Sequence, residues 1–486
     1  MATNRIVLLC LVAALTVASD AVFAQKMSGR GPSPNIGASR PAVPDGPRGG
    51  YPGGGHRGPR WGGVVPGIVV GYPAGSYIVD DTGPSGPRRT QANRRGSSGA
   101  PAANERRLVP DEVVIELSNS TSPQQLESLQ RRHRLTPLES QAFQLSGTTL
   151  YRWQILGGRS VATVVRELEA DRLIAWAQPN YLFMQQQKET RSEGDAAQYG
   201  LAKMRLPQAH ALAKGDNVLV AVIDSGIDGN HPELAGSIAG AFDALSAPAA
   251  PHQHGTAIAS LIAAHGRLMG SAPDAKILAA RAFDSKDSGA EGTTFSILKS
   301  LDWAAAQGAR VINMSFAGPA DPAIHRSLEA ARKKGIVLVA AAGNAGVKSP
   351  PLFPAADPNV IAVSATDADD RLIEQSNRGR HITVAAPGAQ ILVAIPDNGY
   401  EMSSGTSYAA AEVSGIVALM LQRRPDLTPD KVKAILRATA RDIGPKGPDA
   451  MFGAGLADAY GAVTAGVAPV AATGQRPVER VSTGAR

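Results

Sequence analysis

Apolar runs alternate with helical patterns from about residue 199 onwards. The run VLVAVI (218–223) is continuously apolar, as are residues 311–312 and 336–339, which is typical of strands buried on both faces. Helical spacing between these runs is seen at Phe295, Leu298, Leu301 and Ala305. Strands that alternate with helices predict a parallel sheet covered by helices on both faces. Because sites in such sheets form at the carboxyl ends of the strands, the residues directly after the apolar runs are the candidates for chemistry.

A separate pattern covers residues 108–186. A strand-like run at 113–117 precedes SPQQ (122–125), which supplies a helix cap, a first-turn proline and a capping-box glutamine. Two extended runs, a second helix from Ser160 and a final extended segment complete a β-α-β-β-α-β order, which predicts a small ferredoxin-like α+β domain. Residues 187–197 are polar and without pattern, so we expect a linker, and exposed linkers are where proteases cut.

The N-terminus is typical of an export signal at residues 1–24. Arg5 precedes an apolar run, and VFA (22–24) is a small-residue cleavage pattern. The alternative is an uncleaved membrane anchor, although the apolar run is short for a span. The one cysteine, Cys10, lies inside this signal, so we expect a mature protein with no disulfide, thiolate metal site or cysteine nucleophile.

The net charge of +7 resides in one segment. Residues 25–107 hold twelve Lys and Arg against four Asp and Glu and are rich in Gly and Pro, whereas residues 108–486 hold thirty-six against thirty-seven. We therefore expect no nucleic-acid partner for the folded part. We expect residues 25–107 to be disordered, either as a solvated spacer or as a weak contact to anionic surfaces, and the tail at 466–486 to be disordered as well.

Two candidate residues are an acid and a base. Asp224 directly follows the first apolar run, where a carboxylate can hold an imidazole in one tautomer. His254 begins a helix of small and apolar residues, and a histidine suits proton transfer near neutral pH. Each has an ordinary alternative, because Asp-Ser-Gly is common in turns and the chain has nine histidines, with His231 and His252 nearby in sequence.

Two further candidates are an amide and a hydroxyl. Asn344 follows the apolar run at 336–339, and its amide could meet a developing oxyanion. Ser407 lies at a predicted helix start, where negative charge is favoured; its alternative is a helix cap. The chain order Asp224, His254, Ser407 is that of one of three convergent serine-protease triads. Together the four residues predict acyl transfer with a serine nucleophile and a histidine base.

A set of motifs within residues 198–465 resembles those of the subtilisin-like serine proteases. The motifs are AVIDSGIDGNHPEL (221–234), HGTAIASLIA (254–263), GSAPDAKILAARAF (270–283), NMSFAG (313–318), AAAGN (340–344), GTSYAAAEVSGIVALML (405–421) and FGAGLADAYGAV (452–463). The resemblance implies a doubly wound, mostly parallel α/β fold, with Asp224, His254 and Ser407 as a triad and Asn344 as the oxyanion donor. It also implies a primary specificity pocket lined by Ser315, Phe316, Ala317, Gly318, Ala341, Ala342 and Gly343.

The resemblance extends to the N-terminal domain. Residues 108–186, with AQPNY at 177–181, are similar to the inhibitory propeptides of this family, which implies an intramolecular inhibitor that is later cleaved off. The alternative is a permanently attached interaction domain. Ala411 and Glu412 stand where the family usually has proline and often histidine, and we expect this change to leave the proton path intact.

These features together predict an exported serine endopeptidase that processes its own zymogen, acts on proteins or peptides, and is secreted, periplasmic or at the cell surface. The alternative is a catalytically silent subtilase-like protein that binds peptides or is anchored at a surface. We expect no cofactor for the chemistry, and structural calcium stays unassigned because the sequence has no compact ligand cluster such as an EF-hand loop. Ala317, Ala341 and Ala342 predict an open, apolar specificity pocket.

Overall fold

The structure is a computed structural model that describes residues 98–118, 121–185, 198–245, 250–286 and 289–466. The predicted signal (1–24), most of the predicted spacer and the predicted linker (187–197) lie outside these residues, as does the predicted tail apart from Gly466.

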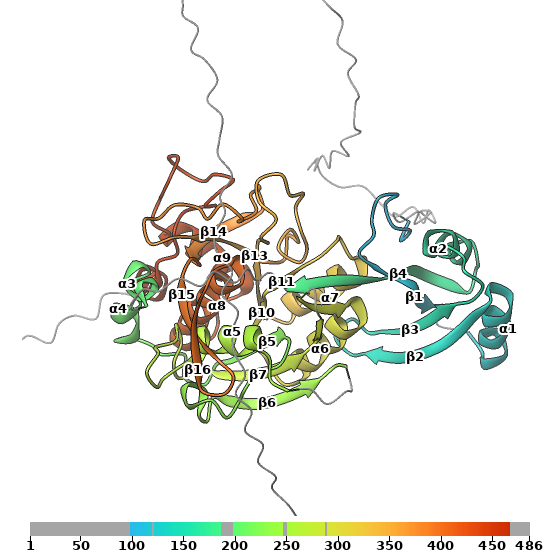
Figure 1. Cartoon of the computed structure of the whole chain (residues 1–486), viewed down its shortest axis with the longest axis horizontal. Helices are drawn as coiled ribbons and strands as arrows, with labels where there is room; N and C mark the ends of the chain where they lie inside the picture. The colour runs from blue at the N-terminus through green and yellow to red at the C-terminus, as the bar shows by residue number, and fades with distance from the viewer. Residues whose placement is uncertain (1–97, 119–120, 186–197, 246–249, 287–288, 467–486) are drawn as a thin grey trace, which may run out of the picture. The chain divides into compact units, whose positions relative to one another are not determined.

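The predicted β-α-β-β-α-β order of the N-terminal domain is present in the structure (Figure 1). Its strands form an antiparallel sheet in the order β2-β3-β1-β4. The elements are β1 (Leu108–Leu117), α1 (Pro123–His133), β2 (Leu135–Phe143), β3 (Thr148–Ile155), α2 (Val161–Glu169) and β4 (Ile174–Gln185).

Local side-chain chemistry sets the helix starts of this domain. Ser122 Oγ accepts a hydrogen bond from the Gln125 backbone N–H at 3.3 Å, and Gln125 Oε1 accepts one from the Ser122 N–H at 2.8 Å, which completes the predicted capping box. Ser160 caps α2 in the same way through the N–H of Thr163. Alternate β1 residues, Val113 and Ile115, are fully buried in one hydrophobic core with residues of both helices.

The N-terminal boundary of this domain differs from the prediction. The predicted disordered segment runs to residue 107, but residues 98–107 make defined contacts. Ser98 Oγ and the Gly99 backbone N–H donate to the two oxygens of Glu169, at 2.6 and 2.5 Å. Gly99 lies so close to β4 that a methyl group there would come 1.9 Å from the Ala177 carbonyl oxygen. The contacts with Glu169 and β4 offset the entropy cost of ordering, which composition alone could not reveal.

The C-terminal domain is built on a seven-stranded parallel sheet in the order β14-β13-β12-β10-β5-β7-β6. The crossovers on either side of β5 make it a doubly wound sheet, as predicted. The strands are β5 (Leu219–Asp224), β6 (Ile238–Asp243), β7 (Lys276–Arg281), β10 (Val311–Met314), β12 (Val337–Ala341), β13 (Ile361–Thr366) and β14 (Ile382–Pro387).

Helices cover both faces of this sheet. Val220 and Val222 of β5 belong to a core with α5 (Gln253–Ala263) and α8 (Thr406–Arg423). The intervening Ala221 and Ile223 belong to a second core with α6 (Thr294–Ala306) and α7 (Pro322–Lys333). The remaining elements are α3 (Tyr199–Lys203), α4 (Leu206–His210), η1 (Pro232–Leu234), β8 (Phe283–Lys286), β9 (Gly289–Thr293), β11 (Phe316–Ala317), β15 (Ile391–Ile395), β16 (Gly399–Ser403), α9 (Pro429–Thr439) and α10 (Ala459–Thr464).

Strand β4 belongs to both domains. Beyond its pairing with β1, it runs antiparallel between β9 and β11 of the C-terminal domain. Leu182 pairs with Thr293 of β9, and Gln185 pairs with Phe316 of β11. The end of β4 therefore lies on one of the segments predicted to line the specificity pocket.

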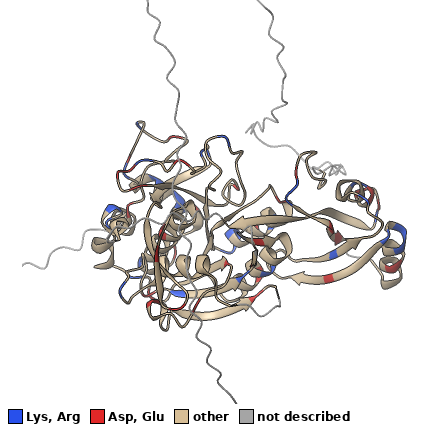
Figure 2. Cartoon of the chain, viewed as in Figure 1, with Lys and Arg blue, Asp and Glu red and all other residues tan. Residues whose placement is uncertain are grey.

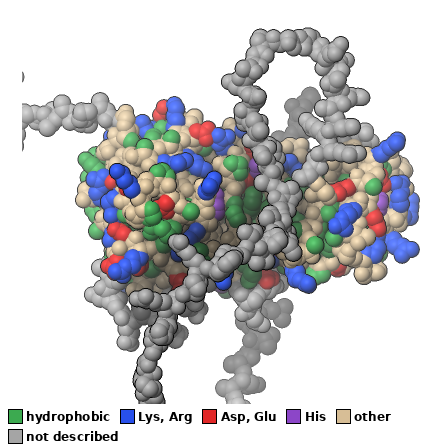
Figure 3. All heavy atoms as spheres, turned by 90° about the horizontal axis from the view of Figure 1, so that it is seen from above, with side chains coloured by type: hydrophobic (Ala, Val, Ile, Leu, Met, Phe, Trp, Pro, Cys, Tyr) green, Lys and Arg blue, Asp and Glu red, His purple; other side chains and the backbone are tan. Residues whose placement is uncertain are grey.

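Charge is mixed over the described residues. Basic and acidic residues are interspersed along the chain in Figure 2, and both signs appear among polar and hydrophobic side chains on the face shown in Figure 3. Within the described ranges, no helix is long and apolar enough to cross a bilayer.

Candidate active site

Asp224 and His254 meet at the carboxyl edge of the sheet. Asp224 is the last residue of β5, and His254 lies in the first turn of α5. His254 Nδ1 lies 2.9 and 3.0 Å from the two carboxylate oxygens, and both side chains are almost completely buried. This geometry orients the imidazole so that its Nε2 faces away from the acid.

The residue after His254 allows this close approach. A methyl group on Gly255 would lie 2.2 Å from the Gly226 carbonyl oxygen and 3.2 Å from Asp224 Oδ1. Any side chain at this position would push the start of α5 away from the end of β5. The glycine of the His-Gly-Thr motif is therefore required by packing.

Ser407 lies at the start of α8 but does not cap it. Gly405 is the N-cap, with no side-chain hydrogen bond to the helix, and Ser407 is the second helical residue. Its Oγ donates to the Ser315 carbonyl oxygen at 3.1 Å, and the side chain is fully buried. The helix-cap alternative for this serine is therefore wrong.

The imidazole of His254 lies near the start of α8. The ring of His254 lies 6.1 Å from the ring of Tyr408, the residue after Ser407. His254 Nε2 is buried and has no hydrogen-bond partner among the described residues. His254 and Ser407 thus lie on two helices, α5 and α8, that pack together in one core.

Asn344 follows β12 and contacts the same helix start. Its Oδ1 accepts hydrogen bonds from the backbone N–H of Thr406 at 3.0 Å and from Thr406 Oγ1 at 2.9 Å. These bonds fix the orientation of the amide, with its Nδ2 donor on the side away from Thr406. Thr406 Oγ1 also accepts from the Gly343 backbone N–H at 3.1 Å, so β12 and α8 are joined at this point.

The two predicted pocket segments border the helix that carries Ser407. Ser315 Oγ donates to the Ser407 carbonyl oxygen at 3.1 Å, while Phe316 and Ala317 form β11. The second segment ends β12 and leads into Asn344. All residues of the two segments are buried: Ser315, Phe316, Ala317, Gly318, Ala341, Ala342 and Gly343. The structure thus brings all the predicted site residues to one edge of the sheet.

Strand β4 occupies the surface beside this site. The Phe183 side chain is fully buried, with its ring 6.0 Å from that of Phe316 at an interplanar angle of 85°. A methyl group on Gly318 would come 2.2 Å from the Phe183 ring. The last residue of β4 contacts Asp224, because Gln185 Nε2 donates to Asp224 Oδ1 at 2.5 Å.

Sequence reasoning missed a second histidine at the site. His252 caps α5, its Nδ1 accepting from the His254 backbone N–H at 3.4 Å. The same nitrogen lies 2.7 Å from Ser225 Oγ, which is 3.0 Å from Asp224 Oδ1. His231 is different, because its fully buried ring packs edge-on against Tyr400 and serves the fold.

Glu412 is buried beside the helix that carries Ser407. Only 4 % of the residue is exposed, and its Oε2 has no hydrogen-bond partner among the described residues. Burial raises the pKa of this carboxyl to about 8, although the nearby polar side chain of Ser271 acts to lower it. That glutamate at position 412 leaves the proton path intact stays a prediction.

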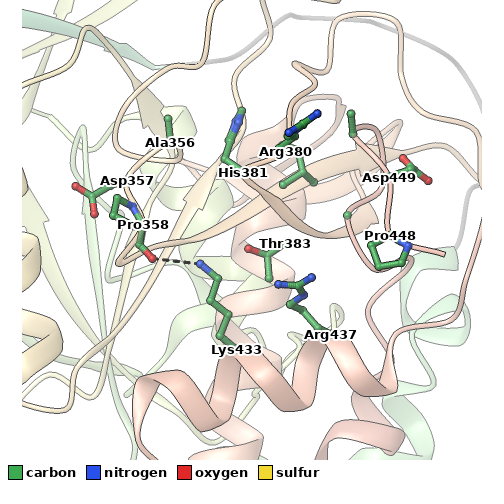
Figure 4. A pocket seen from close by; sticks show the side chains of 13 residues that line it. Ala356, Asp357, Pro358, Arg380, His381, Thr383, Lys433, Arg437, Pro448 and Asp449 are labelled. Carbon is green, nitrogen blue, oxygen red and sulfur yellow. Dashed lines mark hydrogen bonds between the residues drawn. The ribbon is translucent and has the colours of Figure 1, made fainter. Parts of the chain in front are cut away.

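A cavity away from the site has a volume of about 490 Å³ (Figure 4). Its lining includes Arg380, His381, Arg437 and Lys433, whose Nζ donates to the Val360 carbonyl oxygen at 2.7 Å. Burial lowers the pKa of this lysine. The cavity contains none of the predicted site residues. Among the described residues, no group of three or more His, Cys, Asp or Glu side chains could hold a metal ion.

Comparisons with known proteins identify the family of the C-terminal domain. The sequence profile of the subtilase family matches residues 215–455. Thermitase from Thermoactinomyces vulgaris is 36% identical over 274 residues, which cover 55% of this chain and 95% of thermitase. Subtilisin E from Bacillus subtilis (strain 168) is 33% identical over 292 residues, which cover 58% of this chain and 74% of that protein.

A solved structure supports the fold. The crystal structure of fervidolysin from Fervidobacterium pennivorans, a keratinolytic enzyme related to subtilisin, superposes with a TM-score of 0.63 at 24% identity. The match covers 74% of this chain and 61% of that chain. With its doubly wound parallel sheet and its 36% identity over 95% of thermitase, the chain belongs to the subtilase family of serine endopeptidases.

Proposed function

We propose that this protein is an exported serine endopeptidase that hydrolyses peptide bonds through Asp224, His254 and Ser407. The observation that carries the proposal is the buried contact of His254 Nδ1 with both oxygens of Asp224, at 2.9 and 3.0 Å, next to the helix start that bears Ser407. His254 Nε2 takes the proton of Ser407 as Oγ attacks the scissile carbonyl, and it later protonates the leaving amine. Water then releases the acyl group by the same steps in reverse order.

The oxyanion would be stabilised at the start of α8. Asn344 Nδ2 and the backbone N–H of Ser407 are the proposed donors, and the amide of Asn344 is held in position by Thr406. Donors held in position before the reaction need no reorganisation when charge develops on the carbonyl oxygen, which is the basis of their catalytic effect. The pocket for the substrate side chain lies between residues 315–318 and 341–343 in this proposal.

The N-terminal domain is proposed to act as an intramolecular inhibitor. The support is β4, which adds a strand between β9 and β11 and inserts Phe183 against Phe316 and Gly318. An extended segment bound by strand addition is how a peptide substrate would also bind. Cleavage within residues 187–197, directly after β4, would convert this zymogen into the mature enzyme.

A serine-directed fluorophosphonate tests the triad. We expect it to label Ser407 in the mature protein, and we expect His254→Ala to abolish the labelling while the protein stays folded by circular dichroism. Absence of label on the folded wild type would contradict the proposal and would favour a silent peptide-binding protein. Hydrolysis of casein by the same preparation provides an independent measure.

Self-processing and export need separate measurements. We expect the purified Ser407→Ala precursor to remain uncleaved, because removing the nucleophile stops the acyl transfer. Normal maturation of that variant in a protease-free preparation would exclude self-processing. The N-terminal sequence of the protein recovered outside the cytoplasm would locate both the signal cleavage near residue 24 and the maturation cleavage.

A further inference from the structure

His252 contacts both elements that carry the Asp224–His254 pair. It is the N-cap of α5, where its Nδ1 accepts the backbone N–H of His254 at 3.4 Å. The same Nδ1 lies 2.7 Å from Ser225 Oγ, at the end of β5. Ser225 is 2% exposed, and its Oγ lies 3.0 Å from Asp224 Oδ1. One imidazole nitrogen thus connects the start of the histidine helix to the end of the aspartate strand.

These contacts depend on the protonation state of His252. A neutral imidazole with its proton on Nε2 leaves Nδ1 as an acceptor for the His254 N–H, whereas a protonated imidazole is a donor at both nitrogens and can accept nothing. Protonation would therefore remove the cap of α5. It would also place a positive charge at a helix N-terminus, where the helix dipole disfavours it.

The Ser225 hydroxyl would respond to the same change. It has one hydrogen, which it can donate either to His252 Nδ1 or to Asp224 Oδ1. When His252 is protonated, its Nδ1–H becomes the donor in that pair, and the Ser225 hydrogen turns fully to Asp224. The hydrogen bonding of the aspartate and the position of the histidine would then change together.

We propose that neutral His252 is a positioning residue for Asp224 and His254. Its protonation slows catalysis by disturbing the contact between the His254 imidazole and the Asp224 carboxylate. The inference rests on the proposed function of Asp224, His254 and Ser407. His252 is not proposed to touch substrate or to transfer a proton.

The groups that surround His252 favour its neutral form at neutral pH. Burial lowers its pKa, the negative charge of Asp224 opposes this, and the proximity of His254 adds to the lowering. From the side of β7, Arg281 approaches Gly226 and is paired with Asp243 at 2.8 Å and Asp284 at 3.0 Å. From β16, Glu401 is bound by Gln253 of α5. His252 should therefore take up its proton only in acid.

The pH dependence of kcat/KM for the mature enzyme tests the proposal. In an enzyme of this kind, the catalytic base becomes protonated in acid and can no longer accept a proton. A plot of log(kcat/KM) against pH then has a slope of about 1 on its acid side. We expect the wild-type acid limb to be steeper than this, with a slope that approaches about 2 over roughly one decade of activity, because protonation of His252 adds its own loss of about 10-fold to that caused by protonation of the base. In His252→Asn, whose Oδ1 can still cap the helix but cannot titrate, the slope should return to about 1.

A second variant and a control complete the experiment. His252→Ala removes the cap acceptor, so we expect kcat to fall roughly 10-fold at pH 8 with little change in KM, and His252→Asn to restore most of it. The matched control is His381→Asn, another half-buried histidine whose pKa is lowered by burial, which lines the 490 Å³ cavity and should leave the limb unchanged.

Coincident acid limbs for wild type and His252→Asn would overturn the proposal, as would a kcat of His252→Ala within 2-fold of wild type. Labelling of Ser407 by the fluorophosphonate is measured on the same preparations. If the wild type is labelled at Ser407 but its acid limb coincides with that of His252→Asn, only the role of His252 is rejected. If the wild type is not labelled, the proposed function on which this role rests is rejected.

Discussion

The ring of Phe183, near the end of β4, meets the ring of Phe316 in β11 edge-on, with centroids 6.0 Å apart. Phe316 also lies against Phe283 at 4.8 Å, so the aromatic side chain from the N-terminal domain completes a cluster in the C-terminal domain. Sequence patterns assign these two phenylalanines to separate domains. Their contact is an apolar link between β4 and the proposed substrate cleft.

Phe183→Ala should weaken the hold of the N-terminal domain on the cleft. Removing a buried phenylalanine side chain costs about 3–5 kcal/mol, which corresponds to at least a 100-fold weaker association after cleavage. We expect activity to appear earlier during maturation, measured as a shorter lag before casein hydrolysis. The control is Phe452→Ala, which removes another buried phenylalanine, from a separate core cluster of the C-terminal domain that includes no residue of β4. Equal lag times for wild type and Phe183→Ala would contradict the role of this contact.

Gly318→Ala should weaken the same contact from the other side. The added methyl group would lie 2.2 Å from the Phe183 ring, so β4 cannot keep its position. We expect a shortened lag in this variant as well. In the double variant with Phe183→Ala, the clash is gone, and the second substitution should add little to the first. Additive effects of the two substitutions would show that they act at independent places.

Asn344→Ala should lower turnover with little effect on substrate binding. Loss of an oxyanion donor typically lowers kcat by about 10²–10³-fold. Steady-state kinetics on a peptide substrate would measure kcat and KM separately. Thr406→Ser is the matched control, because it keeps the hydroxyl that donates to Asn344 Oδ1. An unchanged kcat in Asn344→Ala would remove this residue from the proposed mechanism.

Glu412→Gln should make the protein more resistant to alkaline pH. Because the pKa of Glu412 is raised from 4.5 to about 8, the native state holds a proton over this window that the unfolded state has lost. The free energy of unfolding should therefore fall as pH rises from 4.5 to 8, by an amount on the order of 3–5 kcal/mol. Glutamine cannot ionise, so the variant should lose less stability over the same range.

Urea unfolding of the Ser407→Ala precursor at pH 5 and pH 9 would measure this effect without self-digestion. Glu374→Gln, at an exposed carboxyl, is the control and should track the parent protein. If the stability difference between parent and Glu412→Gln is the same at both pH values, Glu412 does not carry the proposed proton.

The sequence by itself determined the fold class and the element boundaries at which Asp224, His254, Asn344 and Ser407 lie. These features depend on residues that are near neighbours in the chain, so they can be recognised in the sequence. They are the continuous apolar runs, the helical spacing and caps such as Ser122. Local patterns also predict that the disordered segment ends at residue 107. They do not indicate that Ser98 and Gly99 bind Glu169, about seventy residues later in the chain.

Only the tertiary structure decided which side chains meet. Nothing local to Phe183 indicates a partner in Phe316. Nothing next to Glu412 in the sequence indicates that its Oε2 is buried with no hydrogen-bond partner in the part of the chain that the structure describes. The sequence does not distinguish His252 from the other histidines. Its contact with Ser225 Oγ arises only because β5 and α5 pack together. Contacts of this kind depend on how elements far apart in sequence pack together, because burial and hydrogen-bond partners are properties of the assembled core.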